Sequence, residues 1–121
     1  MRDGVAAVKS RAFAIRIVHL YQYLRTDKKE YVMSKQILRC GTSIGANLAE
    51  AEYAITKKDF LSKIYIALKE ASETRYWLQL LYDTKYLEKM QYQSLLRDCE
   101  ELLKILSATT NTLTAELCSK E

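Results

Sequence analysis

The stretch RCGTSIGANLAEA, residues 39–51, decides how the chain is read, because it holds two of the three glycines and could form either a loop or a helix. Apolar or small residues recur through it at spacings of three and four. The full set is Met33, Ile37, Gly41, Ile44, Leu48, Ala51 and Ile55. A loop would interrupt this helical period, and the period continues without a break. The stretch is therefore predicted to be a packed helix.

Glycine inside a helix needs a compensating contact, since each one costs about 1 kcal/mol relative to alanine. Gly41, Gly45 and Ala49 are four residues apart, so on a helix they form a strip without bulky side chains. We expect a second helix to pack closely there. A phosphate-binding loop is excluded, because no Lys-Ser/Thr pair follows the glycines and no strand precedes them.

The rest of the chain predicts an all-α fold in one domain, residues 1–121. Proline is absent and glycine is scarce, so the regular turn signals of a β fold are missing. Apolar residues recur with helical spacing over about 5–26, 56–82 and 88–117, and Thr56 with Asp59 predicts a helix start. Four long helices with short links predict an antiparallel up-down-up-down four-helix bundle.

Polar residues run beside the apolar stripes of the second and third helices. They are Gln36, Ser43, Asn47, Glu50, Glu70 and Glu73. A carboxylate-bridged metal site would need Glu-x-x-His pairs, and the single histidine, His19, has no acid three residues before it. A general acid–base pair would need a nucleophile or substrate pocket, and none can be named. We interpret the set as a structural polar seam, and expect no catalytic residue, metal or cofactor.

The cysteines indicate the compartment. Cys40, Cys99 and Cys118 are an odd number without a Cys-x-x-Cys pair, which argues against a zinc site and a disulfide framework. Reduced thiols are typical of the cytoplasm, which is the expected location. No stretch approaches the roughly 18 continuous apolar residues that a membrane span needs, so no membrane association is expected.

Two helices carry apolar residues outside their main stripes, where a monomeric bundle would be polar. These residues are Ile15 and Val18 in the first helix, and Ile66, Trp77 and Leu81 in the third. A second apolar row on two helices indicates a second burial surface. We therefore expect a homo-oligomer whose interface contains these side chains.

The net charge of +4 is unevenly distributed, since residues 1–63 hold 12 Lys or Arg against 6 Asp or Glu. The candidate contacts to RNA or DNA are Arg11, Arg16, Lys35, Arg39, Lys57, Lys58 and Lys63. A basic excess of this size is also common on ordinary solvated faces. Clustering of these residues on one assembled face would favour nucleic-acid binding, and dispersal would favour a protein-binding scaffold.

Two longer motifs carry a family resemblance. They are QILRCGTSIGANLAEA, residues 36–51, and DFLSKIYIALKEASETRYWLQLL, residues 59–81. The matching positions are Thr42, Ser43, Ile44, Gly45, Ala46, Asn47, Glu50, Glu73, Thr74, Tyr76, Trp77 and Leu78. In these the chain resembles the bacterial four-helix bundle proteins called large-subunit rRNA intervening-sequence proteins. Cys40 is a small departure, because serine is more usual there.

The resemblance implies an antiparallel four-helix bundle that assembles into a closed ring of five. The family's biochemical role is not established; nucleic-acid binding is inferred from genes placed within rRNA insertions and from basic surfaces. The accessory proteins of diversity-generating retroelements are similar in fold. We expect a non-enzymatic, ring-forming bundle that binds RNA or acts as an accessory protein. The alternative is a protein-binding scaffold without nucleic-acid contact.

Overall fold

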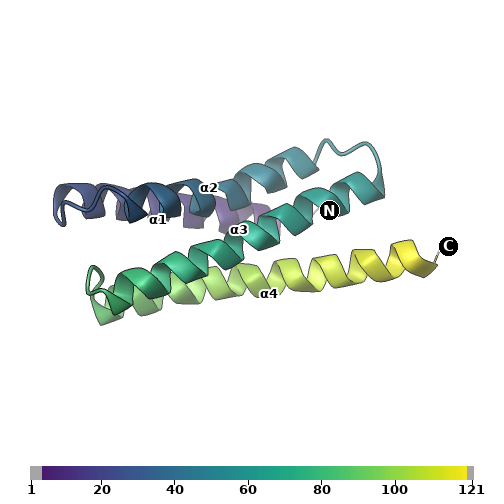
Figure 1. The fold of residues 1–121 in the computed structure, drawn as a ribbon. Coiled ribbons are helices and arrows are strands. Elements are labelled where there is room, and N and C mark those ends of the chain that lie inside the picture. The colour runs from purple at the N-terminus through teal and green to yellow at the C-terminus, as the bar shows by residue number, and fades with distance from the viewer. Residues whose placement is uncertain (1–3, 120–121) are drawn as a thin grey trace.

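The computed structural model describes residues 4–119, which form four long α-helices. They are α1 (Val5–Thr26), α2 (Met33–Ala51), α3 (Lys57–Asp83) and α4 (Lys89–Ser119). Successive helices run in opposite directions (Figure 1), so the predicted up-down-up-down bundle is confirmed. Each helix packs against its neighbours in the chain, and α4 also packs, less extensively, against α1. Within residues 4–119, no helix has the length and apolar character that crossing a membrane requires.

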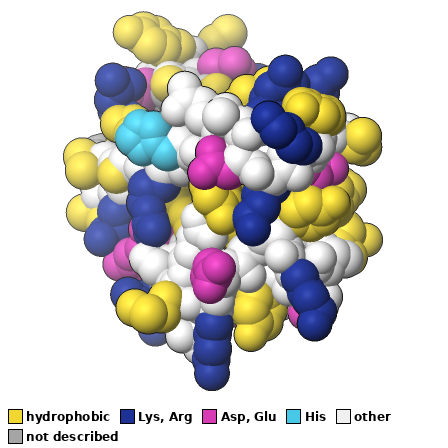
Figure 2. Space-filling view, turned by 90° about the vertical axis from the view of Figure 1, so that its left-hand side faces the viewer, with side chains coloured by type: hydrophobic (Ala, Val, Ile, Leu, Met, Phe, Trp, Pro, Cys, Tyr) yellow, Lys and Arg dark blue, Asp and Glu magenta, His cyan; other side chains and the backbone are white. Residues whose placement is uncertain are grey.

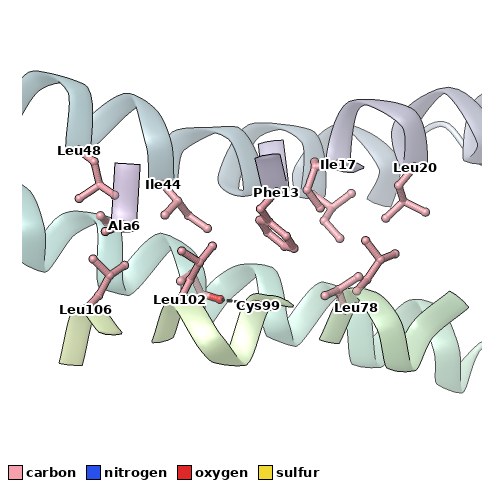
Figure 3. Close-up of a cluster of buried hydrophobic side chains, with 14 of the residues drawn as sticks. Ala6, Phe13, Ile17, Leu20, Ile44, Leu48, Leu78, Cys99, Leu102 and Leu106 are labelled. Carbon is pink, nitrogen blue, oxygen red and sulfur yellow. Dashed lines mark hydrogen bonds between the residues drawn. The ribbon is translucent and has the colours of Figure 1, made fainter. Parts of the chain in front are cut away.

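The core lies between the α1–α2 pair and the α3–α4 pair. Figure 3 shows side chains of the first pair, such as Phe13 and Ile44, pointing toward Leu78 and Leu102 of the second. Phe13 is 1% exposed, and Ile44 and Leu78 are fully buried. These positions belong to the stripes that the helical spacing identified, because a stripe on one face of a helix is what a bundle buries.

The links 27–32 and 84–88 are two tight turns at one end of the bundle, on the left in Figure 1, and the link 52–56 lies at the other end. Lys29 and Lys85 reverse the chain in these turns with φ angles of 56° and 71°. Non-glycine residues adopt this left-handed conformation only as single residues in such places. Backbone N–H groups of Lys85 and Tyr86 donate to the carbonyls of Tyr82 and Leu81 and close the α3–α4 turn.

Glu30 fixes the start of α2. Its carboxylate accepts hydrogen bonds from the backbone N–H groups of Val32, Met33 and Ser34, at 3.1, 3.0 and 2.7 Å. The first N–H groups of a helix have no partner within the helix, and the positive end of the helix dipole favours a carboxylate. Glu30 is therefore buried although it lies in a charged link that the sequence indicates to be a surface connection.

The boundary between α2 and α3 corrects one prediction. α2 ends at Ala51, and Ile55, the last residue of the predicted stripe, is 91% exposed in the link. The Thr56 hydroxyl accepts a hydrogen bond from the Asp59 N–H at 3.0 Å, as the sequence predicted for the start of α3. This cap requires extended backbone at Thr56, with φ −131° and ψ 164°, so the helical period cannot continue through the link.

Candidate functional site

The two glycines of α2 face α1 at close range. A β-carbon at Gly41 would lie 2.9 Å from both Cγ1 and Cγ2 of Ile17, and one at Gly45 would lie 3.2 Å from the Ser10 hydroxyl. The small strip is thus the place where α1 approaches α2. Ala49 is exposed and takes no part in this contact, which corrects its inclusion in the strip. Ala49 lies four residues after Gly45, and this further rotation along α2 turns its side chain away from α1.

An arginine with two glutamates and a tryptophan joins α2 to α3. Arg39 forms an ion pair with Glu70 at 3.3 Å and another with Glu73 at 2.5 Å. The Trp77 indole N–H donates to the Glu73 carboxylate at 3.0 Å. These hydrogen bonds, from Trp77 first and then from Arg39, lower the pKa of Glu73. The hydrogen bond to Glu73 raises the pKa of Arg39 in turn. Glu73 is therefore held as the ionised partner of Arg39.

The other residues of the predicted polar seam fall into three groups with different contacts. Glu50 pairs with Lys63 across the two helices at 2.8 Å, and hydrogen bonding to Glu50 raises the pKa of Lys63. Asn47 donates its side-chain N–H to the Ser43 carbonyl of the same helix at 2.9 Å, so its bond stays within α2. Gln36 is exposed to solvent. The inter-helix part of the seam is formed by ion pairs of α2 with α3.

Four of the seven predicted nucleic-acid contacts are already paired with carboxylates of the chain. Besides Arg39 and Lys63, Arg16 pairs with Asp98 of α4 at 2.7 Å. Lys57 pairs with Glu116 at 2.9 Å. The other three, Arg11, Lys35 and Lys58, form no ion pair with any residue of 4–119. Lys35 lies near the start of α2 and Lys58 near the start of α3, and these two helices begin at opposite ends of the bundle, so in a single chain the seven are spread along its length.

Of the five predicted interface residues, three remain exposed in the single chain. Ile15 is 49% exposed, and Val18 and Ile66 are each 37% exposed. Trp77 is half-buried against the core. Leu81 is fully buried and belongs to the core of its own chain, which corrects its place among the interface candidates. α3 turns Leu81 inward together with Leu78, since residues three apart share a helix face.

The buried thiols are inert at neutral pH. Burial raises the pKa of Cys40 to about 11 and that of Cys99 to about 12, so both stay protonated and pack as small apolar groups. Among residues 4–119, no three His, Cys, Asp or Glu side chains are grouped to hold a metal ion. An open pocket of about 720 Å³ lies at the end with the 52–56 link, and its lining includes Leu48, Ile55 and Phe60.

Six basic residues that lie at or beside the two tight turns form a group that the sequence reading largely missed. We call this end of the bundle, residues 21–35 and 82–92, the turn end. Its cations are Arg25, Lys28, Lys29, Lys35, Lys85 and Lys89, of which only Lys35 was predicted. None of them pairs with a carboxylate within the described residues. The sequence could have indicated this group, because its members lie in or next to two short links, and an up-down-up-down bundle brings these two links to the same end.

This geometry defines an all-α bundle in which α2 holds α1 through its glycines and α3 through its ion pairs. The chain belongs to the 23S rRNA-intervening sequence protein family, whose family model matches residues 2–108. The expected family is thereby confirmed.

The fold is also found in a crystal structure at 1.70 Å of a protein from Bacteroides thetaiotaomicron, described as a protein of unknown function from the S23 ribosomal protein family. The two chains are 53% identical and superpose with a TM-score of 0.89, over 92% of this chain and 99% of the other. None of the curated proteins compared with the chain matches it.

Proposed function

We propose that this chain is a non-enzymatic, cytoplasmic bundle that assembles into a ring and binds RNA through the turn end of each subunit. The carrying observation is that the six cations of the turn end have no carboxylate partner within the described residues. The turn end holds six Lys or Arg against four Asp or Glu, and Glu30 is buried on the start of α2. The opposite end, residues 4–11, 52–60 and 108–119, holds four Lys or Arg against three Asp or Glu, and two of these cations, Lys9 and Lys57, are paired with Glu101 and Glu116.

Cations that are free of carboxylate partners are the ones that phosphates can bind with a net gain. Each such contact releases counterions from the RNA, whereas a lysine in an ion pair must first give up its partner. Figure 2 looks onto the turn end, where dark blue basic side chains are spread among hydrophobic, acidic and other side chains. A ring would present several copies of this end together, so that weak contacts gain effective concentration.

Two separate apolar faces support a ring over a two-fold dimer. Ile15 and Val18 lie on α1, and Ile66 lies on α3, where Tyr65 and Tyr76 are also exposed, at 53% and 56%. α1 and α3 are diagonal in the bundle, with no close approach of their backbones, so their outer faces are different surfaces. Contacts between two different surfaces are heterologous, and they form a ring when the rotation from one subunit to the next closes. The number five comes from the family resemblance.

The ring is tested by its mass. Multi-angle light scattering at micromolar concentration should give five times 14.0 kDa, about 70 kDa. Ile15→Glu and Ile66→Glu should each release monomers, because each places a charge in the apolar contact. Met90→Glu is the matched control, since Met90 is 83% exposed at the start of α4. A monomeric mass for the unmodified chain would rule out the ring.

RNA binding is tested by filter binding across a salt series. The protein should retain RNA at about 50 mM salt and lose affinity steeply as salt rises, and Lys28→Glu/Lys29→Glu should reduce both affinity and salt slope. The matched control is Lys57→Glu/Lys58→Glu, which changes the same charge at the opposite end. If the unmodified protein retains no RNA at about 50 mM salt, the protein-binding scaffold replaces this proposal. An equal loss of RNA affinity in both variants would show that the turn end is not the binding surface.

A further inference from the structure

The two segments that form the turn end share a composition that charge alone does not explain. YQYLRTDKKEY (residues 21–31) and YDTKYLEKMQY (residues 82–92) each begin and end with tyrosine and contain a third. Six of the nine tyrosines are thus in these segments, which the fold brings to the same end of the bundle (Figure 1). Three of the six, Tyr23, Tyr86 and Tyr92, pack partly buried against the core, whereas Tyr31 is 47% exposed.

Tyrosine rings, and not carboxylates, position the basic side chains of the α1–α2 turn. The guanidinium carbon of Arg25 lies 5.5 Å from the centroid of Tyr21 and 5.1 Å from that of Tyr31. The ammonium nitrogen of Lys28 lies 5.9 Å from the centroid of Tyr23. A cation held against a ring is oriented without losing its net charge, unlike one in an ion pair. These cations therefore remain available to phosphate.

The α3–α4 side of the turn end carries a stacked aromatic pair. The rings of Tyr82 and Tyr92 are parallel within 3°, with centroids 4.3 Å apart. Both are half-buried, so they are held in place by the bundle. On the other side, Tyr31 is 47% exposed in its turn. The turn end thus combines fixed ring faces with unneutralised cations within one surface.

We infer that the turn end binds single-stranded RNA, with its lysines and Arg25 on the phosphates and unpaired bases stacked on its tyrosines. The inference rests on the proposed RNA binding and adds the class of RNA. In a duplex the bases stack on one another, so a tyrosine side chain cannot stack on their faces. Basic grooves interleaved with aromatic side chains are the common means of holding single strands, because every base has a face to stack.

The test compares two RNAs on the full-length assembled protein by fluorescence anisotropy. The probes are a labelled 20-nucleotide oligouridine and a 20-base-pair RNA duplex at the same salt concentration. The single strand should bind more tightly. Tyr31→Ala should weaken single-strand binding about tenfold, within the range that one stacked base contributes, and should weaken duplex binding much less, because Arg25 keeps its contact with Tyr21. Tyr31→Phe keeps the ring and should keep the affinity.

Tyr53→Ala is the matched control, because Tyr53 is 86% exposed in the link at the opposite end. An unchanged thermal melt of each variant verifies that the fold is intact. Equal affinity for single strand and duplex, with no effect of Tyr31→Ala, would overturn the single-strand inference and leave RNA binding in place. Failure to bind either RNA would overturn the proposed function and the inference together.

Discussion

Gly41→Leu should lower the free energy of unfolding by about 3 kcal/mol or more, the upper part of the range for overpacked contacts. The first added carbon alone would lie 2.9 Å from two carbons of Ile17, and the leucine side chain adds three more. Ile17 is fully buried between the helices, so it cannot turn out into solvent to make room. Either α1 must move away from α2, or the bundle does not fold. The small gain in helix propensity over glycine, about 1 kcal/mol, does not offset this.

Urea unfolding followed by circular dichroism measures the effect. Gly45→Leu should be intermediate, at about 1–3 kcal/mol, because its first carbon meets the Ser10 hydroxyl at the longer distance of 3.2 Å. Ala49→Leu is the matched control on the same helix, since Ala49 is exposed, and it should change stability little. A Gly41→Leu protein as stable as Ala49→Leu would show that α1 does not pack closely on this strip.

The helices could be predicted because burial imposes a period on the sequence itself. The three- and four-residue spacing of apolar positions continues without a break through Gly41 and Gly45. Positions with this spacing share one face of the helix, and in a bundle that face is buried. The end of α2 could not be found in this way, because Ile55 continues the period by chance. There the boundary is decided by the hydroxyl of Thr56, which acts through the backbone and leaves no mark on the apolar pattern.

The candidate site was less predictable. The sequence shows which side chains are charged, but it does not show which of them form ion pairs with one another. Arg39 is one of the predicted nucleic-acid contacts. The antiparallel packing of α2 and α3 places it beside Glu70 and Glu73, which are 31 and 34 residues away in the sequence. Local spacing carries no information on such a register. The same limit hid the turn end, whose two segments meet only after the chain has formed α2 and α3.

Glu30→Ala should lower the free energy of unfolding by about 2–3 kcal/mol, a large effect for a residue in a surface turn. The change removes three hydrogen bonds from a charged acceptor, each to a backbone N–H at the start of α2. Water can replace the carboxylate at Val32, which is 72% exposed. It cannot do so easily at Ser34, which is fully buried and whose N–H donates the shortest of the three bonds, 2.7 Å.

Two variants separate the cap from the loss of a charge. Glu30→Gln keeps one acceptor oxygen and should lose about half as much stability, since a neutral acceptor makes weaker bonds. Glu88→Ala is the matched control, because Glu88 is an exposed glutamate just before α4 in the other turn. Hydrogen exchange adds a local measurement: in Glu30→Ala the amides of Val32, Met33 and Ser34 should exchange faster, while those of α4 should not change. If Glu30→Ala and Glu88→Ala unfold at the same urea concentration, Glu30 does not hold the start of α2, and the burial of its carboxylate needs another cause.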